Sequence, residues 1–429
     1  MTIVACSTPP GVSGIAVVRI SGKGAIKNIS TFVKDSPFDD KTPLSRVCFL
    51  VDRDGEVFDE AVITSYVGPN SYTGENLVEI SCHGNPKIIS RIIDLSVDAG
   101  SRLAEAGEFT KTAFLNGKLD LSEAESVASI IHSLSLTGVK AGVKNLKGGL
   151  SKEIHSIKSS LISIVANLEF NLDISEEDLQ PNLLKQSGET ILKVDKKLND
   201  CIRCFEETKM FQSGASVVIL GPPNAGKSTL FNRLVNKNQS IVTSVEGTTR
   251  DVIEKNINIS GLPILLKDTA GIRDSGDDVE KIGVERSFVE AKDADLVVVL
   301  NDRSLSFGDT KHIHVFNKSD IKTPDEKYDI SISAKTGDGI KKLKETVYNS
   351  LVGNKVQTDT LIISKRQCNA IKGALKHIKE AHLLLLAGDS IELLIEDINR
   401  SIGFLDSITE KTTKDDVLDA VFSSFCVGK

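Results

Sequence analysis

The sequence predicts a multidomain protein of α/β, α+β and all-helical parts, in which a helical domain is interrupted by an inserted α/β domain. Its 429 residues suit about three domains. Strand and helix signals alternate between residues 214 and 353, which is typical of a parallel α/β sheet. Helical periodicity occurs on both sides of that region, so the α/β segment is expected to interrupt the helical one.

The composition excludes several classes of protein. Contents of 40% hydrophobic and 26% charged residues are ordinary for a globular chain, which excludes a disordered or collagen-like protein. A formal net charge of −7 argues against nucleic-acid binding through a generally basic surface, although a local basic patch stays compatible. No apolar run approaches the roughly 20 residues that span a bilayer, and no basic targeting segment begins the chain. We therefore expect a cytoplasmic protein without membrane attachment. Seven cysteines are too few for a disulfide scaffold.

Residues 1–118 are expected to form an α+β domain. Short β-rich runs alternate there with turns of Gly, Pro and Asn. The runs are Ile15–Ile20, Val47–Val51, Ala61–Tyr66 and Leu77–Ser81.

Residues 119–211 and 355–429 are expected to form one discontinuous helical domain around the inserted domain at 214–353. Ser122 and Glu125 have the spacing of a capping box, which predicts a helix start there. Apolar residues then recur every three or four positions, as one helix face requires. They are Ile154, Ile157, Leu161, Ile164, Leu168 and Leu172. A last apolar face comprises Val417, Leu418, Val421, Phe422 and Phe425.

The inserted domain opens with a phosphate-binding loop. Gly221–Ser228 reads Gly-Pro-Pro-Asn-Ala-Gly-Lys-Ser and fits G-x-x-x-x-G-K-[ST] between a predicted strand, Ser216–Leu220, and a predicted helix, Thr229–Val235. The glycines let backbone amides curl around an anion, and the helix N-terminus adds a positive dipole. We expect Lys227 to reach the β- and γ-phosphates and the Ser228 hydroxyl to bind Mg²⁺.

Three further motifs follow in the order of a guanine-nucleotide site, each at a predicted strand end. Asp268–Gly271 reads Asp-Thr-Ala-Gly. Its aspartate is in the Walker-B position, and the backbone amide of Gly271 can sense the γ-phosphate. Asn317–Asp320 reads Asn-Lys-Ser-Asp, and its carboxylate can accept the two N–H groups of guanine that adenine lacks. Ser333–Lys335 reads Ser-Ala-Lys and is expected to back the guanine oxygen. Together the motifs predict a Ras-like P-loop G domain that binds and hydrolyses GTP, of the translation-factor class.

The polar segment Gly247–Asp251 lies between the phosphate loop and the Walker-B strand, so we expect it to be switch I, with Thr249 as the second Mg²⁺ ligand. The residues expected to bind GTP lie on the phosphate loop, on and before switch I, and on the three later motifs. They are Asn224, Ala225, Gly226, Lys227, Ser228, Thr229, Thr243, Ser244, Val245, Glu246, Gly247, Thr248, Thr249, Asp268, Thr269, Ala270, Gly271, Asn317, Lys318, Asp320, Ser333, Ala334 and Lys335.

One departure bears on the mechanism. Many small GTPases place Gln directly after D-x-x-G to orient the attacking water, whereas this sequence has Ile272. An aliphatic side chain cannot orient water, so another group must do so. The candidates in this segment are Arg273, Asp277, Asp278, Glu280 and Glu285.

The links between the last strands are short. About ten residues separate the predicted strands Ala294–Leu300 and His312–Phe316, whereas parallel strands usually need a dozen or more. We therefore expect the connecting helix to be shortened or missing. The link from Asp320 to Asp329 is short too.

Over essentially its whole length the sequence resembles the MnmE (also TrmE) family of tRNA-modifying GTPases. The segments that carry the resemblance stand in the family's order. They are Thr2–Ala5, Thr8–Gly11, Arg19–Gly22, Gly68–Glu75, Glu79–Gly84, Gly107–Thr110, Ala113–Leu121, Gly247–Asp251 and Phe425–Lys429. The resemblance implies an N-terminal α/β domain like those that bind tetrahydrofolate, followed by a helical domain that holds the G domain. It also implies a homodimer formed through the N-terminal domain.

The activity implied by the resemblance is a GTP-dependent modification of the wobble uridine of certain tRNAs at carbon 5. An aminomethyl or carboxymethylaminomethyl group would be added together with an FAD-dependent protein, MnmG (also GidA), in a heterotetramer. The one-carbon donor would be a tetrahydrofolate derivative, 5-formyl or 5,10-methylene. The folate site would fall on Arg19, Glu79, Lys118 and Lys429. Arg and Lys suit the glutamate tail, and a carboxylate suits the N–H donors of the pterin.

The resemblance also implies K⁺-stimulated hydrolysis by paired G domains, with K⁺ in the place of an arginine finger. Its ligands would fall on Asn224, Thr243, Val245 and Thr248. The implied water-orienting acid is Glu280, which would answer the problem raised by Ile272. Arg250 and Asp251, at the end of switch I, are further catalytic candidates.

Cys426 has two interpretations. It stands four residues from the end, where a lipidation cysteine would lie, but Gly428 and Lys429 fit that motif poorly. In the family the C-x-G-K terminus is associated with the modification chemistry, as a nucleophile or as a positioning element near the folate.

An alternative function is that of a ribosome-assembly GTPase acting as an rRNA-binding switch. It would call for an RNA-binding module after the G domain, such as a KH domain with G-x-x-G. Residues 355–429 are predicted to be helical and offer no such motif.

Overall fold

The computed structural model describes residues 1–172, 181–236, 253–268, 289–308, 310–324, 327–353, 364–388, 390–409 and 415–429. The chain divides into two compact units. The first comprises Met1–Ala128, Asn145–Asp195 and Asn369–Lys429, and the second comprises Ser129–Lys144 and Lys196–Cys368. None of the described helices is both long and apolar enough to cross a bilayer.

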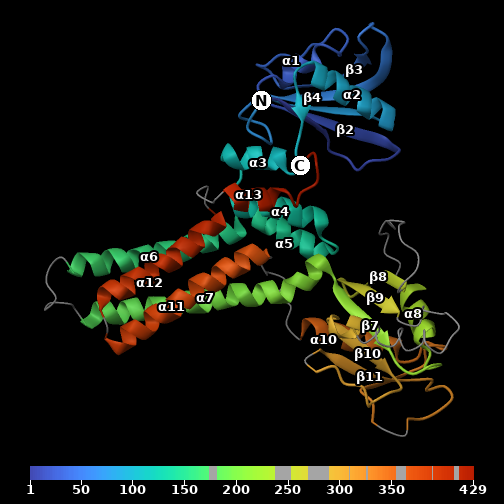
Figure 1. Ribbon diagram of the computed structural model, residues 1–429, viewed down its shortest axis with the longest axis vertical. Coiled ribbons are helices and arrows are strands. Elements are labelled where there is room, and N and C mark those ends of the chain that lie inside the picture. Colours follow the sequence, from blue (N-terminus) through green and yellow to red (C-terminus); the bar gives the residue numbers. More distant parts are fainter. Residues whose placement is uncertain are drawn as a thin grey trace. The chain divides into compact units, whose positions relative to one another are not determined.

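A six-stranded sheet of order β3-β4-β5-β2-β1-β6 forms the N-terminal part of the first unit (Figure 1). Its strands are β1 (Ile3–Cys6), β2 (Ser13–Ser21), β3 (Leu44–Val51), β4 (Val57–Tyr66), β5 (Leu77–Gly84) and β6 (Arg102–Leu103). Helices α1 (Ala25–Ile29) and α2 (Pro86–Asp98) pack on one face through residues such as Ile29 and Ile92. Since side chains alternate along a strand, the β2 neighbours of buried Val18 and Ile20 face the opposite side.

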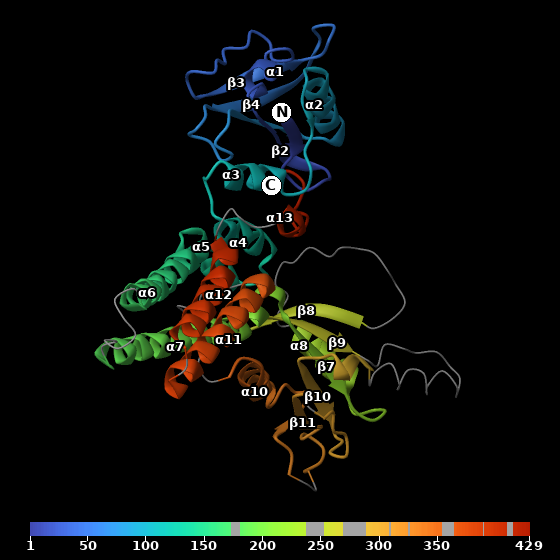
Figure 2. The ribbon, with the colours of Figure 1, turned by 60° about the vertical axis from the view of Figure 1, so that its left-hand side comes forward.

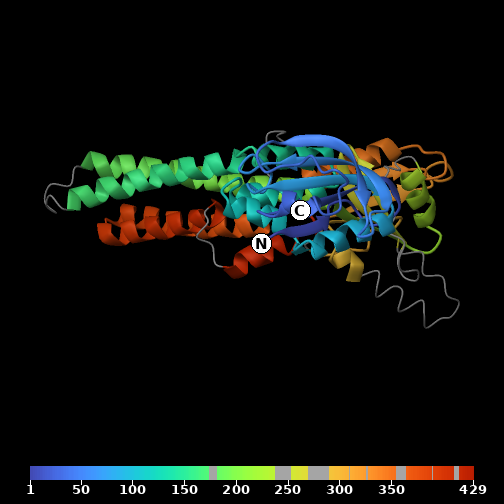
Figure 3. The same cartoon turned by 90° about the horizontal axis from the view of Figure 1, so that it is seen from above.

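The rest of the first unit is helical. Helix α3 (Glu108–Leu115) contacts α13 (Asp415–Phe422), and the Phe114 and Phe422 rings lie 6.2 Å apart (Figure 2). Helix α6 (Gly149–Leu172) runs beside α12 (Ile391–Thr409), which follows the G domain in sequence (Figure 3). Helices that precede and follow the second sheet in sequence therefore pack together in the first unit, as the predicted fold class requires. The helical part of the chain also contains α4 (Leu121–His132), α5 (Leu136–Leu146), α7 (Pro181–Ser213) and α11 (Lys365–Ala387). Most of α5 and the second half of α7 belong to the second unit.

The capping box at the start of α4 lies two residues earlier than Ser122 and Glu125 predict. The Asp120 amide donates to Glu123 Oε2 at 2.9 Å, and the Glu123 amide donates to Asp120 Oδ1 at 2.8 Å. Ser122 is buried inside the helix instead. A carboxylate three residues before Glu123 makes the same reciprocal pair as a hydroxyl would, and it leaves Leu121 free to enter the core.

The second unit is built on a second six-stranded sheet, of order β12-β11-β10-β7-β9-β8. Its strands are β7 (Ala215–Leu220), β8 (Ile253–Ile259), β9 (Leu262–Asp268), β10 (Leu296–Leu300), β11 (His312–Asn317) and β12 (Ile330–Ile332). Only β8 is antiparallel to its neighbour. Helices α8 (Lys227–Asn236) and α10 (Ile340–Val352) cover one face. The predicted P-loop α/β domain, inserted in the helical one, is confirmed.

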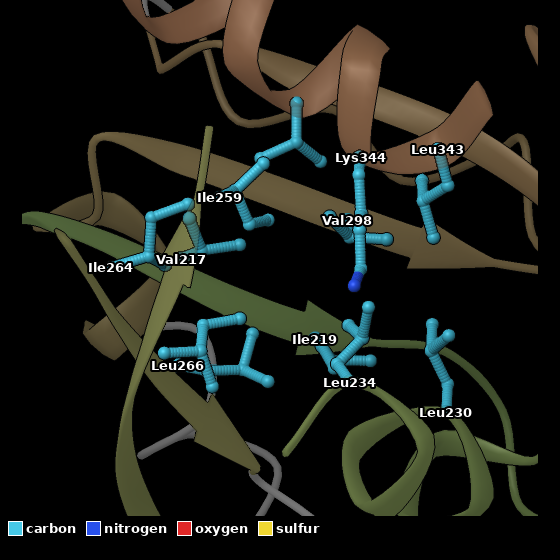
Figure 4. Close-up of a pocket in the computed structure, with 12 residues that line it drawn as sticks. Val217, Ile219, Leu230, Leu234, Ile259, Ile264, Leu266, Val298, Leu343 and Lys344 are labelled. Carbon is cyan, nitrogen blue, oxygen red and sulfur yellow. The ribbon is translucent and has the colours of Figure 1, made fainter. Parts of the chain in front are cut away.

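The face covered by α8 and α10 encloses a small cavity of about 10 Å³ (Figure 4). Its lining is aliphatic, with Val217, Ile219 and Leu266 from the sheet and Leu234 from α8, apart from Lys344 on α10. The volume holds about one water molecule, so this cavity is part of the core packing and not a ligand site.

The opposite face of this sheet is covered in part by residues before β10, where residues 289–292 are helical and Ala291 is buried, and in part by a loop after β10. Among the described residues, the links from β10 to β11 and from β11 to β12 contain no helix, as the short spacing predicted. Phe307, in the first link, is 7% exposed and packs with Val218, Leu220 and Val299. One aromatic side chain on a loop thus does part of the covering that a crossover helix usually does.

We predict that Phe307→Ala destabilises the second unit by about 3 kcal/mol, because it leaves a cavity over the sheet. Calorimetric unfolding of the full chain should show the transition of this unit shifted to lower temperature. Ile321→Ala is the matched control, since Ile321 is 76% exposed and its truncation should leave the transition unchanged. An equal shift for both variants would contradict the covering role of Phe307.

Candidate functional site

The carboxyl ends of the parallel strands meet at one edge of the second sheet, which is where ligands bind in open α/β folds. The loop after β7 begins at Gly221, whose φ is +150° and where a Cβ would lie 2.5 Å from the Leu300 carbonyl. At Gly226, with φ +94°, a Cβ would lie 2.4 Å from Asn317 Nδ2. Both positions require glycine, so the loop motif is dictated by close approach to its neighbours.

The lysine of this loop is folded back over it. Lys227 Nζ donates to the Gly221 carbonyl at 2.8 Å and to the Pro222 carbonyl at 3.1 Å. Burial lowers the pKa of Lys227, and the nearby Asp268 opposes that shift. The side chains of Ser228 and Thr229 are exposed at the first turn of α8, and Asn224 is exposed with a left-handed φ of +60°. The loop thus presents a cation, hydroxyls and a helix N-terminus together, as a phosphate ligand requires.

The last residue of β9 is Asp268, which is 1% exposed. Strand β9 pairs in parallel with β7, with Asp268 opposite Ile219, so the carboxylate lies next to the start of the phosphate loop. A buried carboxylate beside a lysine and a serine hydroxyl is a suitable outer partner for a hydrated Mg²⁺ ion.

Asn317 joins three loops at the end of β11. Its Nδ2 donates to the Ala225 carbonyl of the phosphate loop at 2.8 Å, and its Oδ1 accepts from the Ala334 amide at 2.9 Å. Its own amide donates to Asn301 Oδ1 at 2.6 Å. Asn301 has a φ of +52°, and Lys318, next to Asn317, has +74°. Left-handed residues at two neighbouring strand ends are typical of backbone held for function.

A cleft of about 540 Å³ opens beside Asn317 and Lys318, and it is also lined by Phe316 and Tyr328. Asp320 lies two residues beyond Lys318 and is exposed.

The Ser333–Lys335 loop is fixed from α8. Arg233 Nε donates to the Ala334 carbonyl at 3.0 Å, and Arg233 Nη2 donates to the Lys335 carbonyl. Ser333 is fully buried, and its hydroxyl accepts from the Thr336 amide at 3.1 Å. Because Arg233 is on the helix that begins in the phosphate loop, one side chain ties the phosphate side of the site to the base side.

The structure brings together the predicted residues of the phosphate loop, Asp268 and the two base-side motifs. The remaining predicted residues lie outside the described part of the chain. These are Thr243, Ser244, Val245, Glu246, Gly247, Thr248, Thr249, Arg250, Asp251, Thr269, Ala270, Gly271 and Glu280. Of the predicted K⁺ ligands, only Asn224 is described.

A second polar site lies on the first sheet, on the face opposite α1 and α2. Arg19 of β2 stands directly across from Glu79 of β5 in the strand register, and Arg19 Nη2 lies 2.6 Å from Glu79 Oε1. The Arg19 guanidinium lies 5.5 Å from the centre of the Tyr72 ring and 5.7 Å from that of Phe109. The side chain is only 12% exposed. This is an ion pair walled by aromatic rings, in which each partner fixes the other.

The chain's C-terminus lies on this site. Val427 forms an antiparallel bridge with Ala106. The Gly428 carbonyl accepts from Ser7 Oγ at 3.0 Å and from Arg19 Nη1 at 3.3 Å. A Cβ at Gly428, whose φ is +93°, would lie 2.6 Å from the Cys6 carbonyl, so the terminal segment needs glycine to approach so closely.

Lys429 is therefore held close to a second cation. Burial lowers the pKa of Lys429, and the positive charge of Arg19 lowers it further. Burial also raises the pKa of Tyr66, and the Glu79 carboxylate adds to that increase. The Glu79 carboxylate, which pairs with Arg19, opposes the lowering of the Lys429 pKa, so the site combines two cations and one carboxylate.

The other predicted residues of this region lie at its edges. Lys118 is exposed, and its Nζ donates to the Pro69 carbonyl at 3.0 Å, so it is fixed on the 68–75 loop that also carries Tyr72. Cys426 is exposed, and its negative form would raise the pKa of Lys429. The structure thus places Arg19, Glu79 and Lys429 together, with Lys118 beside the loop that adjoins them.

Three residues of these sites were missed by the sequence reasoning: Asn301, Arg233 and Ser7. Asn301 follows an apolar strand directly, as do Asp268 and Asn317, and that position could have singled it out. Arg233 and Ser7 carry no such signal, because their partners are backbone carbonyls of distant segments.

The sequence is similar to known proteins over its whole length. Residues 2–118 match the family model described as GTP-binding protein TrmE N-terminus, and residues 121–426 match that of the MnmE helical domain. The tRNA modification GTPase MnmE of Aquifex aeolicus (strain VF5) is 38% identical over 445 residues, covering 100% of this chain and 99% of that protein. The protein of the same name from Thermotoga maritima is 35% identical over 455 residues, covering 100% of both.

Solved structures are similar over part of the chain. A structure of Era from Aquifex aeolicus is 25% identical, covers 38% of this chain and 66% of that one, and has a TM-score of 0.26. The G domain of the FeoB iron transporter of T. maritima is 24% identical, covers 32% and 98%, and has a TM-score of 0.24.

We predict that Arg233→Ala weakens guanine-nucleotide binding about tenfold, because two hydrogen bonds from α8 to the Ser333–Lys335 loop are lost. Titration of a fluorescent GDP analogue into the full-length protein measures this. Arg203→Ala is the control, since Arg203 is exposed on α7 and pairs with Asp200. Unchanged affinity in Arg233→Ala would show that the loop keeps its position without α8.

Proposed function

The chain belongs to the MnmE (TrmE) family of tRNA modification GTPases and is itself a GTPase with a P-loop G domain, and on this basis we propose that GTP hydrolysis drives modification of the tRNA wobble uridine at carbon 5. The added group is aminomethyl or carboxymethylaminomethyl. The reaction takes place in the cytoplasm, together with the FAD-dependent MnmG (GidA) protein in a heterotetramer. The proposal rests on full-length similarity to tRNA modification GTPases. The ordered phosphate loop and its hydrogen bond to Asn317 on the base side support it.

The residues present fit GTP and Mg²⁺. Gly221 and Gly226 let the loop pack closely against Leu300 and Asn317, and Lys227 lies over the loop through its hydrogen bond to the Gly221 carbonyl. We propose that Lys227 contacts the β- and γ-phosphates, while Ser228 and Thr249 hold Mg²⁺, which neutralises phosphate charge when bound. Asp268 accepts hydrogen bonds from the ion's water shell. The full GTP-binding set is the one predicted from the sequence motifs.

The base side supports guanine selectivity. Asp320 accepts the two N–H groups of guanine, and the Ala334 amide and Lys335 form the wall at the guanine oxygen. Asn317 holds these two motifs and the phosphate loop at a fixed separation through its hydrogen bonds to Ala225 and Ala334. A purine without the exocyclic amine leaves the carboxylate unsatisfied, which disfavours its binding.

For hydrolysis we propose that Glu280 orients the attacking water, because Ile272 cannot, with Arg250 and Asp251 assisting from switch I. Asn224, Thr243, Val245 and Thr248 would hold K⁺, which supplies positive charge near the transferring phosphoryl group. Asn224 supports this, since it is exposed at the phosphate loop with a backbone conformation that its neighbours do not share. Paired G domains of two chains would close around the nucleotide.

For the second site we propose a tetrahydrofolate derivative, 5-formyl or 5,10-methylene, as the ligand that supplies one carbon. The Arg19–Glu79 pair, the Tyr72 and Phe109 rings and the crowded cation of Lys429 suit a ligand that has both an aromatic ring system and carboxylates. Lys118 would contact its outer end. Cys426, exposed two residues before Gly428, would lie at the reacting end, as a nucleophile or as a positioning group.

The domain arrangement we propose is 1–118 for folate binding and homodimerisation, 119–211 with 355–429 for the helical domain, and 214–353 for the G domain. The N-terminal domain would pair two chains and so keep their G domains within reach of each other.

We expect GTP hydrolysis by the purified protein to be much faster in KCl than in NaCl at equal ionic strength. The proposed ligand oxygens select the larger ion, and without it the charge at the phosphoryl group is not compensated. Phosphate release measures the rate, and GTP binding in each salt is the control. Equal hydrolysis rates in both salts would contradict the proposed K⁺ site and favour the alternative function, an rRNA-binding switch.

We expect Glu280→Ala to reduce hydrolysis at least 100-fold while the affinity for GTP stays within twofold, because the residue acts on water and not on nucleotide. Glu285→Ala, five residues on, is the matched control and should keep its activity. Loss of GTP binding in Glu280→Ala would mean that Glu280 is a structural residue.

A further inference from the structure

A cluster of three ligand-type side chains lies on helices α11 and α12, outside both sites. Figure 1 shows the two helices side by side. His377 Nδ1 is 3.0 Å from Glu380 Oε2 and 3.0 Å from Asp397 Oδ1. His377 and Glu380 share one face of α11 because they are three residues apart, and Asp397 comes from α12. We propose that this cluster binds a divalent transition-metal ion, with Zn²⁺ as the best match, and so joins the two helices.

The geometry is close to that of a tetrahedral site. The three ligand atoms all lie within 4.8 Å of one another. Zinc bonds of about 2.1 Å to nitrogen and oxygen place tetrahedral ligand atoms about 3.4 Å apart, so small side-chain shifts suffice. Glu380 is the most exposed of the three at 41%, against 14% for His377 and 15% for Asp397, so a fourth position open to water lies on its side. One imidazole with two carboxylates suits Zn²⁺ or Mn²⁺.

The charge balance of the cluster favours a cation. The two carboxylates of the cluster share one Nδ1–H, which cannot satisfy both, and the nearest lysine, Lys376, is exposed and lies 3.8 Å from Glu380 only. In the described part of the chain, Asp397 forms its ion pair with His377, whereas the partly buried Glu108 pairs with an arginine, Arg102. A divalent ion would supply the full positive charge that the partly buried Asp397 carboxylate needs as a partner.

The imidazole ring is held in place for this role. The Phe404 ring of α12 stacks on His377, with centres 5.7 Å apart and planes 23° apart. One turn before His377, Gly373 makes room for that ring, since a Cβ there would lie 2.6 Å from Phe404 Cε1. Asp397 and Phe404 are seven residues apart and therefore share a face of α12. The ring plane is thus fixed with Nδ1 toward both carboxylates, which is the pre-organisation that a metal site needs.

The test is calorimetric titration of Zn²⁺ into the full-length, chelator-treated protein without nucleotide. We expect one equivalent that is lost in His377→Ala and in Asp397→Asn. Glu396→Gln should retain it, because Glu396 adjoins Asp397 but pairs with exposed Arg400. His83→Ala should also retain it, since it removes a His–Asp pair that offers only two ligands. Binding should weaken on acidification, because the imidazole must give up its proton.

Two measurements keep the outcome decisive. Co²⁺ replaces Zn²⁺ as a spectroscopic probe. The Co²⁺ ion that the cluster variants fail to bind should show no thiolate charge-transfer bands in the wild type, which distinguishes the cluster from binding at cysteines. Glu380→Gln, at the exposed corner, serves if Asp397→Asn does not fold, as judged by circular dichroism and GDP binding. If the wild type and the folded cluster variants bind the same number of metal ions, the proposal is overturned. His377 would then only link α11 to α12 through its contacts with the two carboxylates.

Discussion

The hydrogen bonds of Asn317 are the interaction on which the nucleotide site depends. The phosphate loop, the Asn-Lys-Ser-Asp motif and the Ser-Ala-Lys loop follow strands β7, β11 and β12, and β10 stands between β7 and β11. One buried amide side chain bridges that gap, because it donates to Ala225 and accepts from Ala334. Gly226 is glycine for the same reason, since a Cβ would meet this amide. The phosphate loop and the Ser-Ala-Lys loop are thereby held at one separation.

The G domain reaches this arrangement with less structure than parallel sheets usually use. The described links after β10 and β11 contain no helix, and Phe307 closes part of the face they would cover. The strand ends are unaffected, because they are positioned by the sheet register and by Asn301, Asn317 and Arg233. Shortening the far face therefore leaves the nucleotide edge intact.

The two ends of the chain form the second site by a similar logic. Cross-strand pairing sets Arg19 against Glu79, and the Gly428 carbonyl then binds the same guanidinium. A terminal segment that lacked glycine at this position could not approach Cys6 and Ser7 so closely. Lys429 and Cys426 are consequently brought to a site whose Arg19 stands 409 positions before Gly428.

Much of this could be predicted from the sequence, and the exceptions have physical reasons. Strand periodicity, the loop motifs and the helical stripes predicted both sheets, the insertion and the short links. The start of α4 was predicted two residues too late, because an aspartate caps a helix as effectively as a serine does, and Asp120 takes the position predicted for Ser122. Arg233, Ser7 and the His377 cluster could not be foreseen, since each acts on partners that only the tertiary fold brings near. The roles of switch residues such as Glu280 stay predictions, as they lie outside the described residues.

The most direct test of the account is modification of a tRNA by the purified protein with the FAD-dependent partner, a folate donor and GTP, read by mass spectrometry of the wobble nucleoside. We predict a modified uridine that requires hydrolysable GTP and disappears in Lys227→Ala. Equal modification without GTP, or with Lys227→Ala, would contradict the claim that hydrolysis at this site drives the reaction.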